Sequence, residues 1–140
     1  MVAGARAVRF DRPAAGALEL VGRSAAIMRV QELARRAALV EGGVLLVAGR
    51  GCAVEPVARE LHERGRPPTA PYLVVDCAAG DSPYLARCLF GEVADQTPPD
   101  LESVTADCRI AAACGGTLFL QDVTELSAAA QARLARRARR

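Results

Sequence analysis

Three short runs of apolar residues, each of strand length, alternate with helix-like segments along this chain. The runs are VLLVA (44–48), YLVVDC (72–77) and the apolar centre of GGTLFLQDV (115–123). Continuous apolar runs of this length are typical of parallel strands that are buried on both faces. Because the strands alternate with helices, the sequence predicts an α/β layered domain with parallel pairing.

Five segments have helical patterns. An apolar stripe at helical spacing predicts a helix that begins at an N-cap, Ser24, and is ended by the Gly42–Gly43 pair. Residues 54–65 are predicted to form a second helix, with Pro56 in its first turn and Gly65 at its end. The remaining helices are predicted at 82–91 with Ser82 as cap, at 105–114 and at 127–140.

Length and composition set further limits. A chain of 140 residues is about one domain, and we expect a mostly extended lead-in over 1–18 and a core domain over 19–140. No apolar run approaches the ~20 residues needed to cross a bilayer, and the N-terminal residues lack the apolar stretch of a signal peptide. The sequence therefore predicts a cytoplasmic protein with no membrane partner.

The cysteines and the charged residues argue against two kinds of site. The five cysteines are an odd number without a C-x-x-C pair, and His62 is the only histidine, so we expect buried reduced thiols and no metal site. A net charge of +2 does not by itself indicate nucleic-acid binding. All 18 basic residues are arginines, so the chain has no lysine for a phosphate-binding loop.

Three stretches, in the same order, resemble the ATPase domain of bacterial sigma-54-dependent transcription activators, a branch of the AAA+ family. They are LVGRSAAIMRVQELARRAA (20–38), APYLVVDCAA (70–79) with LFG (89–91), and GGTLFLQDVTELSAAAQARLAR (115–136). The last two match the family patterns G-P-F-V-x-V-N-C-A-A, E-L-F-G and G-G-T-L-F-L-D-E. The resemblance implies a three-layer P-loop NTPase-like core, with a short parallel sheet flanked by helices, here lacking the C-terminal strands and helical lid.

The family's phosphate loop, V-L-I-x-G-E-S-G-T-G-K-E, falls on VLLVAGRGCAVE (44–55) without a gap. Gly51 is kept, but Ala48 and Ala53 replace glycines and Val54 replaces the lysine. Such a loop works because backbone N–H groups face the phosphates, glycines let the backbone approach, and the lysine reaches the β- and γ-phosphates. Val54 supplies none of that charge.

The second family motif, L-F-L-D-E, is altered as well. By resemblance, its Asp holds Mg²⁺ and its Glu orients the attacking water, but these positions are Gln121 and Asp122. Gln121 is neutral, and Asp122 is one methylene shorter than Glu. Because phosphoryl transfer depends on neutralising charge, the loss of both lysine and metal carboxylate predicts no hydrolysis and no catalytic residue.

Two further departures concern partners. The G-A-F-T-G-A loop with which family members grip sigma-54 has no counterpart in 92–104, so direct contact with sigma-54 is not expected. The chain stops before the family's sensor strand, which lies between the phosphate-loop strand and the TLFLQ strand. Either these two strands then pair directly or an edge stays open for another chain. A short strand at ARAVRF (5–10) could also cover that edge.

The sequence therefore predicts a regulatory or scaffolding module, linked to transcription regulation, that binds a protein partner and no cofactor. One alternative is a sensor that binds ATP or ADP weakly without turnover. We expect Arg50 to be a solvated turn residue, although it could approach a phosphate, and Cys52 to be a packed small residue. The vestigial nucleotide site would comprise Val21, Gly22, Gly49, Arg50, Gly51, Cys52, Ala53, Val54, Glu55, Gln121 and Asp122.

A second alternative is association with nucleic acid through the arginine-rich C-terminus. Such a tail would give a salt-dependent, sequence-independent affinity. Because no aromatic stacking residue flanks it, we favour a solvated helix end whose cations interact well with the helix dipole. The candidate contacts are Arg133, Arg136, Arg137, Arg139 and Arg140.

Overall fold

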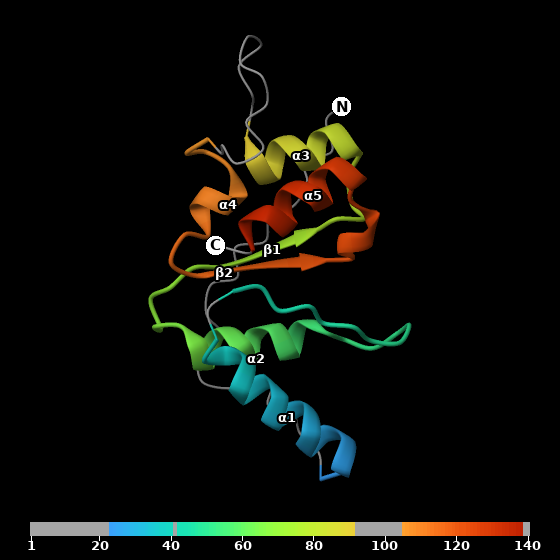
Figure 1. Cartoon of the computed structure of the whole chain (residues 1–140), viewed down its shortest axis with the longest axis vertical. Coiled ribbons are helices and arrows are strands. Elements are labelled where there is room, and N and C mark those ends of the chain that lie inside the picture. The colour runs from blue at the N-terminus through green and yellow to red at the C-terminus, as the bar shows by residue number, and fades with distance from the viewer. Residues whose placement is uncertain (1–22, 41, 92–104, 139–140) are drawn as a thin grey trace. The chain divides into compact units, whose positions relative to one another are not determined.

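The structure is a computed structural model that describes residues 23–40, 42–91 and 105–138. The chain divides between Ala70 and Pro71 into two compact units (Figure 1). The described residues before this boundary are called the helical unit, and those after it the sheet unit. The predicted lead-in over 1–18, the strand at 5–10 and the loop at 92–104 lie outside the described residues.

The helical unit begins with α1 (Ala25–Ala38). Ser24 is its N-cap, as predicted, and the Ser24 hydroxyl accepts a hydrogen bond from the Ile27 N–H at 3.3 Å. The helix ends at Ala38, short of the predicted Gly42–Gly43 pair. Its last turn tightens instead, because the N–H of Leu39 donates to a carbonyl only three residues back.

The second helix of this unit, α2 (Glu55–Gly65), starts one residue after the predicted 54 and ends at Gly65 as predicted, with Pro56 in its first turn. The two helices meet where Gly65 approaches Ala38 so closely that a β-carbon on Gly65 would lie 2.5 Å from the Ala38 carbonyl oxygen. Ala34 of α1 and Ala58 of α2 are buried. Small side chains therefore let the two helices come close together.

Residues 44–48 differ from the prediction, since they form neither a helix nor a strand. They lie in the connection between α1 and α2, where Leu45 is 75% exposed and Val47 is 86% exposed. A strand needs a neighbour for its backbone hydrogen bonds, and the only sheet in the described residues is the β1–β2 pair. The apolar composition of 44–48 therefore did not suffice to predict a strand, because it does not indicate a pairing partner.

The sheet unit contains β1 (Tyr72–Asp76) and β2 (Thr117–Gln121), which confirm two of the three predicted strands. They pair in parallel, in register from Tyr72 opposite Thr117 to Asp76 opposite Gln121. The parallel α/β class is thus confirmed, with a sheet of two strands.

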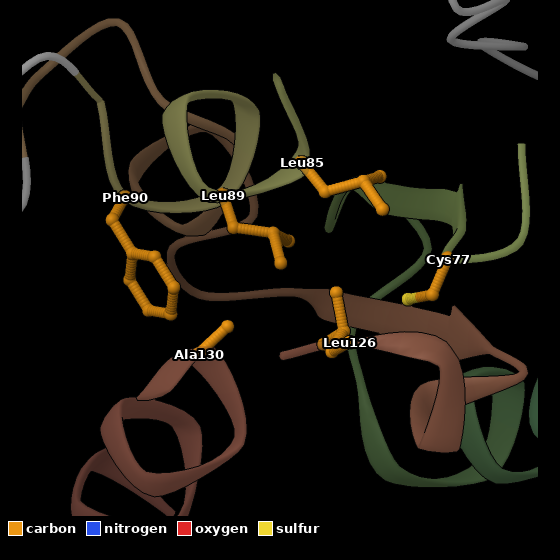
Figure 2. Packing of buried hydrophobic residues seen from close by; sticks show 6 residues of the cluster. All are labelled: Cys77, Leu85, Leu89, Phe90, Leu126 and Ala130. Atoms are coloured by element: carbon orange, nitrogen blue, oxygen red, sulfur yellow. The ribbon is translucent and has the colours of Figure 1, made fainter. Parts of the chain in front are cut away.

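One face of this sheet packs against α3 (Ser82–Phe90) and α5 (Ala128–Arg137). Figure 2 shows the side chains of α3 pointing toward Leu126 and Ala130 across the core. Because side chains alternate along a strand, Val74 and Phe119 lie on the opposite face. Apolar residues on both faces are typical of parallel sheets. The buried cluster comprises Cys77, Leu85, Leu89, Phe90, Leu126 and Ala130.

The N-cap of α3 is Asp81, so the prediction of Ser82 as the cap was wrong. The Asp81 carboxylate accepts a hydrogen bond from the Tyr84 N–H at 2.8 Å. Asp is as good a cap as Ser, and this register also keeps Pro83 in the first turn, where its missing N–H costs nothing.

The predicted helix over 105–114 is reduced to α4 (Arg109–Ala112). It starts late because Thr105 is held outside the helix, with its N–H donating to the Phe90 carbonyl at 3.1 Å. The Cys108 thiol then acts as the N-cap and accepts from the Ala111 N–H at 3.3 Å. The chain next passes through Gly115 and Gly116 into β2.

After β2, a 3-10 turn, η1 (Val123–Glu125), leads to α5. Ser127 caps α5 by accepting a hydrogen bond from the Ala130 N–H at 3.3 Å. The helix ends at Arg137 within the predicted range, and 139–140 are not described. No helix of the described residues is long and apolar enough to cross a membrane.

The cysteines only partly fit the prediction of buried thiols. All five are free, and Cys77 and Cys108 are buried. Cys52 and Cys114 are exposed because each lies in a turn at the surface, not on an inward helix face or strand.

Candidate functional site

The predicted phosphate loop forms a tight turn. The Cys52 N–H donates to the Gly49 carbonyl at 3.1 Å, which closes a four-residue β-turn. Gly51, the third residue, has φ 80°, a conformation that glycine adopts without strain and that this turn requires. One backbone N–H that a phosphate loop would direct at its ligand is therefore bonded within the turn.

The side chains in and after this turn do not form a group that could bind a ligand together. Arg50 is exposed at the second position of the turn. Cys52 is exposed as well, so the expectation that it is a packed small residue was wrong, because it closes the turn at the surface. Val54 is half-buried at the start of α2 and Ala53 is exposed.

The start of α2 has few N–H groups to offer to an anion. Val54 is the N-cap, and its carbonyl accepts from the Val57 N–H at 3.1 Å and the Ala58 N–H at 3.2 Å. Pro56, in the first turn, has no N–H at all. A helix start binds phosphate through several unpaired N–H groups, and here that set is reduced.

A negative charge occupies the same helix start. The Glu55 carboxylate accepts hydrogen bonds from the Arg59 guanidinium at 2.8 Å and 3.1 Å, and both side chains are half-buried. An acidic group in the first turn favours the helix because it faces the positive end of the dipole. The family pattern has the same Glu at this position, so Glu55 does not distinguish this turn from the family's phosphate loop.

The other predicted site residues lie at the carboxyl ends of the two strands. Gln121 ends β2 opposite Asp76, and its carbonyl accepts from the Cys77 N–H at 3.0 Å. Asp122 follows with φ 52° and ψ 47°, a left-handed conformation. Ligands of α/β proteins bind at this end of the sheet. The side chains of Asp76, Gln121 and Asp122 are all exposed there.

The environment of Cys77 combines burial with the negative charge of two carboxylates at this edge. Burial raises the pKa of the Cys77 thiol to about 11, and the negative charges of Asp76 and Asp122 add to that rise. Asp76 also accepts a hydrogen bond from the Ala78 N–H at 2.9 Å. A buried thiol with a raised pKa is a structural residue and not a nucleophile.

Asp76 was not among the sequence-derived site residues. The signal that could have identified it is a charged residue at the end of the apolar run 72–77, since carboxyl ends of parallel strands meet at one edge. Two carboxylates do not make a metal centre, and in the described part of the chain no three His, Cys, Asp or Glu residues are grouped to hold a metal ion.

The candidate basic tail is divided by the structure. The Arg133 guanidinium lies 3.9 Å from the centre of the Phe90 ring, so this arginine packs on the core of the sheet unit. Arg136 and Arg137 are exposed in the last turn of α5, where cations favour the helix dipole. Val21, Gly22, Arg139 and Arg140 lie outside the described residues.

Comparisons with known proteins identify relatives over most of the chain. The model of the sigma-54 interaction domain matches residues 20–138. The DNA-binding transcriptional regulator NtrC of Bradyrhizobium sp. (strain RP501 Parasponia) is 32% identical over 119 residues, which are 85% of this chain and 24% of the relative. The transcriptional regulatory protein XylR of Pseudomonas putida is 34% identical over 116 residues, 83% of this chain and 20% of the relative.

A third relative has a similar identity and coverage. The Nif-specific regulatory protein of Rhizobium leguminosarum bv. trifolii is 34% identical over 118 residues, 84% of this chain and 33% of the relative. The chain thus spans between a fifth and a third of the length of these curated relatives.

Proposed function

The chain belongs to the sigma-54 interaction domain family, and from this premise we propose that it is a regulatory or scaffolding module that binds other proteins without hydrolysing ATP. Its relatives are transcription regulators, so the proposed module acts in transcription regulation. Its finer fold is the family's three-layer P-loop NTPase-like core, which the apolar residues on both faces of the β1–β2 sheet support.

The observation that carries this proposal is the Gly49–Cys52 turn with the start of α2. The turn bonds one N–H internally, Pro56 lacks another, and the Val57 N–H is bonded to Val54. The turn thus lacks the lysine and also has fewer free backbone N–H donors. A phosphate would have neither the lysine charge nor the full set of N–H groups to bind it.

The carboxyl edge of the sheet supports the same proposal. Hydrolysis in the family's manner needs an acidic ligand for Mg²⁺ at the end of β2, and this position is the neutral Gln121. Asp122, at the position of the family's Glu, has a shorter side chain on a left-handed backbone. No catalytic residue is proposed, and no nucleotide is required.

Nucleotide titration and an ATPase assay test the proposal. Calorimetry with ATP and with ADP, each at millimolar concentration with Mg²⁺, is expected to give no heat of binding, and phosphate release is expected to stay at background. Binding without turnover would favour the sensor. Mg²⁺-dependent turnover that Gln121→Ala abolishes would show an ATPase and contradict the proposal.

A matched pair of variants separates side chain from backbone. Val54→Lys returns the lysine but leaves the Gly49–Cys52 turn and Pro56 unchanged, so we expect it to bind no more nucleotide than Val54→Ala. Nucleotide binding gained by Val54→Lys alone would show that the backbone donors are sufficient, and the turn would then not be the reason for the loss.

A further inference from the structure

We draw no further inference here: the strongest candidate, the largely exposed apolar segment of residues 44–48 between α1 and α2 in the helical unit, carries nothing because nothing in the described part of the chain shows what covers it.

Discussion

The two units of the chain stabilise their helices in different ways. In the sheet unit, large side chains such as Leu89 and Phe90 are almost completely buried. In the helical unit, the buried side chains of the described residues are those of Ala34 and Ala58. Among the residues that the structure describes, the large hydrophobic side chains with high exposure lie between Met28 and Val47, in the helical unit.

The difference shows where the folding free energy originates. Burying a Leu or Phe side chain contributes about 1.5–3 kcal/mol, so the sheet unit has a core of its own. The helical unit depends on caps and on the close approach of α1 and α2. Because isolated helices of this length are marginal, the helical unit gains the most from whatever covers its apolar surface.

The largest expected effect is on the core of the sheet unit. Leu89 is 0% exposed, so Leu89→Ala should lower the free energy of unfolding by about 2–5 kcal/mol, through lost burial and a cavity. Leu39→Ala is the matched change in the helical unit, where Leu39 is 84% exposed, and it should cost less than about 0.5 kcal/mol. Urea denaturation measures both. Equal losses would remove the contrast between the units.

A smaller effect is expected where the helical unit is most tightly packed. Gly65→Ala would place a β-carbon 2.5 Å from the Ala38 carbonyl oxygen, so it should cost about 1–3 kcal/mol although alanine favours helices. Gly49→Ala is the control, because its β-carbon would meet only the Cys52 sulfur at 4.0 Å. Amide exchange in α1 and α2 reports the result. If Gly65→Ala increased protection, the helices would not be in contact there.

The next prediction concerns Arg133, a charged residue that packs against the core of the sheet unit. Its guanidinium lies 3.9 Å from the centre of the Phe90 ring, and Arg133→Gln should lower the stability of the sheet unit by about 0.5–2 kcal/mol. Arg136→Gln removes the same charge from an exposed position and should change stability by less than about 0.5 kcal/mol. Thermal unfolding distinguishes the two, and identical midpoints would argue against the ring contact.

The smallest expected effect concerns the serine N-caps, of which each unit has one. Ser24 caps α1 and Ser127 caps α5, each accepting an N–H at 3.3 Å. Changing either serine to alanine should cost about 1 kcal/mol locally. Ser127→Ala should be visible in denaturation of the sheet unit, whereas Ser24→Ala should appear mainly as faster amide exchange at the start of α1. Indistinguishable responses would mean that the units do not differ in how they stabilise their helices.

The features that sequence predicted correctly depend on nearby residues. Ser24 and Gly65 act within one turn of their own helix, so their roles could be inferred from spacing alone. Parallel pairing was predictable because apolar runs of strand length alternate with helical segments, but the pairing of β1 with β2 was not itself predicted. Asp81 instead of Ser82 as a cap is a one-residue difference between two equally good caps.

The features that sequence missed depend on contacts that are distant along the chain. The run 44–48 has a strand composition, but a strand also needs an edge to pair with, and a pattern does not reveal that edge. The late start of the helix predicted over 105–114 results from the hydrogen bond between the Thr105 N–H and the Phe90 carbonyl, across residues 92–104. In the candidate site, the side-chain replacements were evident, but the β-turn of Gly49–Cys52 required the backbone conformation.

The left-handed backbone at Asp122 bears on how such a domain can change over generations. Aspartate and glutamate codons differ by a single base, so the glutamate of the family pattern is one mutational step away. The short aspartate side chain tolerates φ 52° better than the longer glutamate does, since Asp and Asn are enriched in this conformation. That step would therefore carry a conformational cost at this position of about 1–2 kcal/mol or less.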